Sequence, residues 1–194
     1  MKQTRWCTIL LMMNRVYPSF ALIVSAVLLA AVPAHATGNA EQAAEWHDAA
    51  LSRRGTAEAL QRQAAELLEQ ARNWRNKAFI SDAERRRNFG SAGDAEFRAG
   101  EIEEAASVNF SKEADNWHRA ADAFDAVPDT ESGDRARESE NAARESGVAS
   151  LENAVSNFGQ AAEAYSEANA GLPDKAANAE SRADAVNRRL TRGS

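Results

Sequence analysis

The side chains best suited to chemistry after residue 36 are those of two histidines, and that chemistry would be metal binding. His47 and His118 each follow a tryptophan. A di-iron site in a helical bundle uses Glu-x-x-His on two helices, with two further carboxylates. Asp115, three residues before His118, approaches that spacing, whereas the matching position before His47 is Ala44, which has no metal-binding atom. We expect both histidines to be solvated or to cap helices, and retain His47, Asp115 and His118 only as weak metal candidates.

Motifs for catalysis are not found in the sequence. There is no Gly-x-Ser-x-Gly turn and no glycine-rich phosphate loop. The numerous carboxylates are typical of the solvated face of an acidic helical protein. We therefore expect a non-enzymatic protein that needs no cofactor.

The first 36 residues have the order of a secretory signal peptide. A basic segment precedes an apolar run over 16–32, and a small-x-small site follows at Ala34-His35-Ala36. We expect cleavage between Ala36 and Thr37. Translation starting at Met1 and translation starting at Met12 or Met13 would produce the same exported chain.

Export has consequences for localisation and anchoring. The only cysteine, Cys7, lies in the expected leader, and Thr37 occupies the position where a lipoprotein requires a cysteine. A membrane-spanning helix needs about 20 apolar residues, and the chain after Thr37 has no such run. We expect a periplasmic or secreted protein with neither a membrane span nor a lipid anchor.

The charge balance is acidic, with 29 Asp and Glu against 23 Lys and Arg, three of the latter in the expected leader. This balance opposes nonspecific binding to nucleic acid or to anionic lipid. The cluster Arg85-Arg86-Arg87 could contact an anion, but such a run is more typical of a solvated helix face. We expect no nucleic-acid partner.

Periodicity indicates that the chain folds, although its aliphatic content is low. Leu, Ile, Val and Phe form roughly 13% of residues 37–194, below the approximately 20% at which disorder becomes a serious alternative. Yet alanine recurs every seven residues from Ala43 to Ala78. Three residues after each of these alanines stands a second row, which consists mostly of larger residues. Both rows then share one helix face, as in coiled coils. The predicted core residues are Trp46, Leu60, Leu67, Trp74, Phe110, Trp117, Phe124, Leu151, Val155, Phe158 and Tyr165.

Glycine and proline mark the expected turns at 90–94, 127–130 and 171–174. Asp94 would cap the second helix. The helices should then lie near 40–89, 94–126, 130–170 and 174–192. Short turns make consecutive helices antiparallel neighbours. The predicted fold is all-α: one domain over 37–194, an elongated antiparallel bundle with alanine-rich, coiled-coil-like packing.

A helical repeat is the alternative fold. The segment 157–165 echoes 116–124, and Ala161, Tyr165, Ala168 and Pro173 resemble the second helix of a tetratricopeptide repeat. The resemblance covers only this stretch, since the first-helix pattern of that family has no counterpart upstream. It implies a stack of helical hairpins.

For function, the sequence favours a structural, spacer or protein-interaction element. A thin alanine core also suits a chain that gains stability by self-association, with the half over 40–88 as the contact. Two other classes stay open. One is a small-ligand or metal carrier that uses the aromatics of the bundle. The other is an amphipathic protein that opens on a lipid surface, against which the acidic charge argues.

Overall fold

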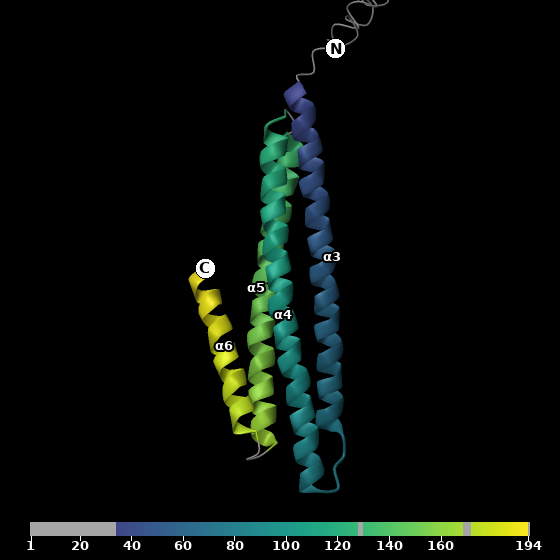
Figure 1. The fold of residues 1–194 in the computed structure, drawn as a ribbon, viewed down its shortest axis with the longest axis vertical. Helices are drawn as coiled ribbons and strands as arrows, with labels where there is room; N and C mark the ends of the chain where they lie inside the picture. The colour runs from purple at the N-terminus through teal and green to yellow at the C-terminus, as the bar shows by residue number, and fades with distance from the viewer. Residues whose placement is uncertain (1–33, 128–129, 169–171, 194) are drawn as a thin grey trace, which may run out of the picture.

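The computed structural model describes residues 34–127, 130–168 and 172–193, and these form four α-helices without a strand. The helices are α3 (Ala34–Asn76), α4 (Asp82–Asp125), α5 (Thr130–Glu167) and α6 (Pro173–Gly193). The three long helices run antiparallel side by side, and the shorter α6 packs on α5 along part of the bundle (Figure 1). The predicted all-α bundle is confirmed, and the long helices replace the stacked hairpins that a helical repeat would require.

The first turn lies at residues 77–81, so the predicted boundary at 90–94 is wrong. The side-chain hydroxyl of Ser81 accepts a hydrogen bond from the backbone N–H of Glu84 at 3.2 Å and caps α4. The Glu84 carboxylate accepts from the backbone N–H of Ile80 at 3.1 Å. This reciprocal pairing closely resembles a capping box, and it satisfies donors that the start of a helix leaves without partners. Asp94 is not a cap but an exposed residue within α4.

The glycines of α4 serve packing rather than a turn. A Cβ atom placed on Gly93 would lie 2.8 Å from the ring of Tyr165, and one on Gly100 would lie 2.8 Å from the ring of Phe158. These glycines therefore let two aromatic rings of α5 lie directly on the α4 backbone. The helix continues through them because this packing outweighs the cost of about 1 kcal/mol that glycine adds relative to alanine.

Small residues form most of the core. The alanine row predicted for the first helix is buried from Ala43 to Ala71, whereas Ala78 lies in the turn and is exposed. Among the predicted large core residues, four are buried: Phe110, Trp117, Phe158 and Tyr165. The other seven are half-buried: Trp46, Leu60, Leu67, Trp74, Phe124, Leu151 and Val155. The bundle is consequently thin, and most of the predicted large core residues are only half-buried.

The remaining boundaries lie within three residues of the prediction, apart from the start of α3. This helix begins at Ala34, so the predicted cleavage site between Ala36 and Thr37 lies in its first turns. Residues 1–33, which hold most of the predicted signal peptide, are outside the described residues. No helix in the described part of the chain combines the length and apolar character needed to cross a membrane.

Candidate functional site

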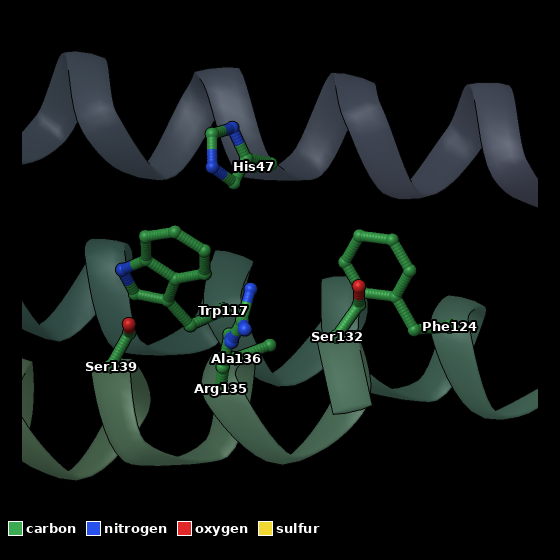
Figure 2. Close-up of a pocket in the computed structure, with 7 residues that line it drawn as sticks. All are labelled: His47, Trp117, Phe124, Ser132, Arg135, Ala136 and Ser139. Atoms are coloured by element: carbon green, nitrogen blue, oxygen red, sulfur yellow. The ribbon is translucent and has the colours of Figure 1, made fainter. Parts of the chain in front are cut away.

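An aromatic cleft lies at the end of the bundle where α3 and α5 begin and α4 ends (Figure 2). The His47 ring of α3 meets the Trp117 ring of α4 edge to face, with ring centroids 5.1 Å apart and an interplanar angle of 88°. The cleft has a volume of about 280 Å³. Its lining residues are His47, Trp117, Phe124, Ser132, Arg135, Ala136 and Ser139. Aromatic walls with an imidazole and a guanidinium would suit a small ligand that has a ring and an anionic group.

A second, more open cleft lies beside Trp46, the residue before His47. The Arg119 guanidinium is 4.5 Å from the centroid of the Trp46 ring, within range of a cation–π interaction. The residues lining this cleft are Asn39, Gln42, Trp46, Arg119, Asp122, Ala123 and Ala126. The guanidinium covers the tryptophan face that a ligand would otherwise use.

A buried carboxylate contacts Trp117 of the aromatic cleft. Glu113 of α4 is fully buried, and its Oε1 accepts a hydrogen bond from the indole N–H of Trp117 at 3.0 Å. The same oxygen is 2.8 Å from Nη2 of Arg54 on α3. Glu113 therefore fixes the orientation of the Trp117 ring and ties α3 to α4.

A second buried carboxylate lies near the opposite end of the bundle. Glu96 of α4 accepts two hydrogen bonds from Arg75 of α3, at 2.9 and 3.0 Å. The hydrogen bond to Glu96 raises the pKa of the Arg75 guanidinium, which also donates to the backbone carbonyl of Gln160 on α5 at 3.0 Å. One arginine therefore links all three long helices.

Glu103 lies between these two ion pairs along α4, in a polar layer of the core. It is buried, and burial raises the pKa of its carboxyl, an effect that a hydrogen bond with Ser150 of α5 partly opposes. Gln61 of α3 donates to the Ser150 hydroxyl at 3.0 Å, so this layer also includes all three long helices. Two amide nitrogens of the described core, those of Asn88 and Asn157, are buried without a hydrogen-bond acceptor.

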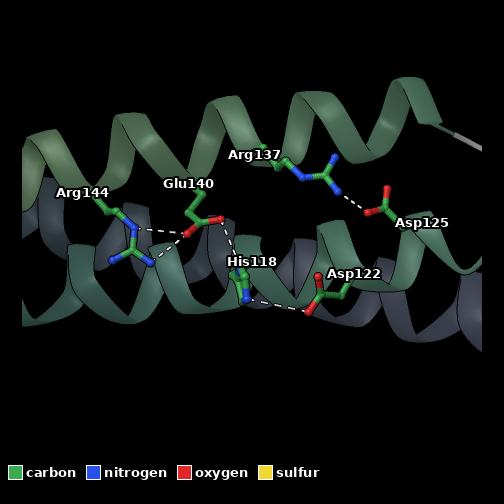
Figure 3. A network of polar contacts seen from close by, with 6 residues as sticks. All are labelled: His118, Asp122, Asp125, Arg137, Glu140 and Arg144. Carbon is green, nitrogen blue, oxygen red and sulfur yellow. Dashed lines mark hydrogen bonds and ion pairs between the residues drawn. The ribbon is translucent and has the colours of Figure 1, made fainter.

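His118 belongs to an ion-pair network between α4 and α5 (Figure 3). Its Nδ1 lies 3.2 Å from Glu140 Oε2, and its Nε2 lies 3.7 Å from Asp122 Oδ2. Partial burial opposes ionisation of Glu140, but hydrogen bonds from Arg144 and His118 hold its pKa below the ordinary value. The imidazole is largely exposed, so this network is a surface contact between helices.

The three weak metal candidates are not assembled into one site. His47 contacts Trp117 and Asp48, His118 contacts Glu140, and Asp115 is exposed on α4. Within the described ranges, no group of three or more His, Cys, Asp or Glu side chains is arranged to hold a metal ion.

Sequence reasoning missed the buried carboxylates, although a signal was present for two of them. The row Phe110 and Trp117 continues toward the N-terminus, at steps of seven, to Glu103 and Glu96. Charged side chains are almost never fully buried unless they are paired. The positions of Glu96 and Glu103 in this core row could therefore have indicated that each has a partner on a neighbouring helix.

Comparisons with known proteins assign no family to this arrangement. No protein-family model matches the chain, and neither a curated protein nor a solved structure matches it significantly.

Proposed function

We propose that this protein is an exported, non-enzymatic rod that acts as a spacer or protein-interaction element in the periplasm or outside the cell. The observation that supports the proposal is the pairing of three long helices in a register fixed by buried polar contacts. α4 has 44 residues, and at 1.5 Å per residue it spans about 65 Å. A rod that keeps its length can hold two other components a constant distance apart.

The polar contacts occur at three levels along α3. Arg54 pairs with Glu113, Gln61 bonds to Ser150, and Arg75 pairs with Glu96. Sliding α3 along α4 would separate both buried carboxylates from their arginines. Removing one partner of a buried ion pair costs about 3–5 kcal/mol. These contacts therefore oppose other registers, which alanine rows alone would tolerate.

The outer side of α3 supports a role in protein interaction. Leu51 is 45% exposed, and Ala44 and Ala65, which share its side of the helix, are exposed as well. These small residues would permit close approach of another helix. A second copy of this chain or another exported protein would bury this surface.

Site-specific photocrosslinking in the native host tests the proposal. A photoreactive amino acid at Leu51 should capture a protein, and one at Glu152, an exposed α5 residue, serves as the matched control. The proposal expects a discrete protein adduct at Leu51 that is absent at Glu152. Protein that forms no adduct at either position, and that purifies from the host with a stoichiometric small molecule, would contradict it.

The aromatic cleft supports a second candidate function, that of a small-ligand carrier. Its volume of about 280 Å³ is at the lower limit of ligand pockets, near 300 Å³. Native mass spectrometry of protein purified from its host tests this function. The carrier candidate expects a bound small molecule that His47→Ala and Trp117→Phe release, while His118→Ala, outside the cleft, retains it. Ligand-free protein from the host would contradict it.

A further inference from the structure

The turn between α3 and α4 forms a protruding tip. Figure 1 shows the start of α4 and the preceding loop extending past the end of α5 and the start of α6. The end of α3, Asn76, lies where this loop begins. The tip, residues 77–87, therefore consists of the loop and the first turns of α4 at one end of the rod.

Two adjacent apolar side chains lie at the apex of the tip. Ile80 is 98% exposed and Phe79 is 48% exposed. The hydrogen bonds that Ser81 and Glu84 make around the start of α4 hold this loop in a defined conformation. An apolar residue just before the N-cap often packs against a residue four positions inside the helix, but that position is Arg85, which offers no apolar partner. The loop therefore presents Ile80 to solvent.

Basic residues flank these apolar residues in the sequence. The Lys77 ammonium lies 4.9 Å from the centroid of the Trp74 ring. The guanidinium groups of Arg85, Arg86 and Arg87 make no ion pair or side-chain hydrogen bond with any residue that the structure describes. Residues 77–87 hold four basic and two acidic side chains, whereas the whole chain has a net charge of −6. The tip is therefore locally cationic on an acidic protein.

We propose that this tip docks end-on onto an anionic phospholipid bilayer. Phe79 and Ile80 would enter the boundary between headgroups and acyl chains, while Lys77 and Arg85–Arg87 contact the phosphates. This inference rests on the proposed spacer function and names the surface to which one end of the rod attaches. A convex, apolar apex with cations behind it fits a soft bilayer, whereas a protein partner would need a matching cavity.

End-on docking also resolves the conflict with the overall acidity. After Glu84, the next acidic residue along α4 is Asp94, ten residues and about 15 Å farther from the apex. Interactions between exposed charges are largely screened beyond about 8 Å at physiological ionic strength. The acidic body of α4 therefore adds little repulsion in this orientation, and docking does not require the bundle to open.

Vesicle flotation of the purified exported protein tests the inference. Vesicles of phosphatidylcholine containing 30% phosphatidylglycerol should carry the protein upward, and vesicles of phosphatidylcholine alone should carry far less. Each basic residue near an anionic surface contributes about fivefold to the partition coefficient, so Arg86→Gln with Arg87→Gln should lower it roughly 25-fold. Phe79→Ser with Ile80→Ser should lower it at least tenfold.

Matched controls separate the tip from the rest of the surface. Arg62→Gln with Arg98→Gln removes two exposed arginines elsewhere, and Val108→Ser with Val148→Ser removes two exposed apolar side chains elsewhere. These variants should float like the parent protein, and circular dichroism should show that all variants remain folded.

Three outcomes would overturn the inference: no flotation, equal flotation with and without phosphatidylglycerol, or equal losses in the tip variants and the controls. Capture of an acidic protein by the tip without vesicle binding would also overturn it. Each of these results leaves the spacer function standing, because the length of the rod and the Leu51 adduct are measured separately.

Discussion

The Trp117 indole donates a hydrogen bond to the Glu113 carboxylate one turn earlier on α4, with the two heavy atoms 3.0 Å apart. Glu113 also pairs with Arg54 of α3, so one fully buried carboxylate orients the largest core ring and joins two helices. Hydrogen bonds to charged groups in a protein interior stabilise more than neutral ones do. The pair therefore couples the register of the rod to the shape of the aromatic cleft.

Removing the arginine of this contact should destabilise the fold. Arg54→Met leaves the Glu113 carboxylate buried without its cation, and we expect a loss of about 3 kcal/mol in the free energy of unfolding. The adjacent Arg53 is exposed and makes no ion pair with the described residues, so Arg53→Met should change stability by less than about 0.5 kcal/mol. Urea denaturation of both variants measures the difference. Equal effects would show that Arg54 does not compensate Glu113.

The glycines provide a second test of packing. Gly100→Ala would place a Cβ atom 2.8 Å from the buried Phe158 ring, and such overpacking should cost about 1–3 kcal/mol. No atom lies within 4 Å of the corresponding position on Gly55, so Gly55→Ala should stabilise α3 by about 1 kcal/mol. Thermal melts should therefore shift in opposite directions. A stabilising Gly100→Ala would mean that α4 and α5 pack less closely than described.

Sequence periodicity predicted the helical bundle because the alanine and aromatic rows depend only on local spacing. It placed the first turn too late because a glycine such as Gly93 has two physical uses, breaking a helix and admitting a neighbouring ring. The second use depends on Tyr165, which is far away in sequence. The capping residues Ser81 and Glu84 were a local signal for the true turn.

The candidate sites were less accessible from sequence. Trp117 was assigned to the core, but its edge-to-face contact with His47 depends on the register of α3 against α4. That register is fixed by buried charges, whose partners are 21 or more residues away along the chain. The exposed tip could not be recognised while Phe79 and Ile80 were assigned to a continuous helix.

The polar core should give the protein a characteristic pH dependence. Burial raises the pKa of Glu103, so the folded state binds this proton more tightly than the unfolded state. Its stabilising contribution is complete below the unfolded pKa of about 4.3 and is lost as the pH rises through the higher folded pKa. The Glu103→Gln variant has no carboxyl to ionise at this position and does not lose stability in this way. The stability of the variant relative to the parent protein should therefore increase as the pH rises above about 4.3.

Denaturation curves at several pH values between 4 and 8 measure this relative stability. Glu138→Gln, at an exposed residue without an ion pair among the described residues, is the control for the removal of a surface carboxylate. The Glu140 carboxylate, whose lowered pKa acts in the opposite direction, is present in all three proteins and cancels in the comparison. A Glu103→Gln difference that stays constant with pH would contradict the assignment.

Self-association through α3 should raise the melting temperature with protein concentration, because assembly stabilises the folded state by mass action. Leu51→Glu should abolish this dependence by placing a charge on the exposed apolar side of α3. Val148→Glu, at an exposed α5 residue, should leave it unchanged. Sedimentation equilibrium would refute self-association by showing a monomer at every concentration.

The rod itself is tested most directly by one distance, measured by double electron–electron resonance. Spin labels at Ile80→Cys and Ala126→Cys would lie at the two ends of α4, and the only native cysteine, Cys7, falls in the expected leader. A rigid rod predicts a single narrow distribution centred at about 70 Å, set by the rise of ~1.5 Å per residue. A broad distribution, or one centred below about 50 Å, would show a bent or open bundle and contradict the rigid spacer.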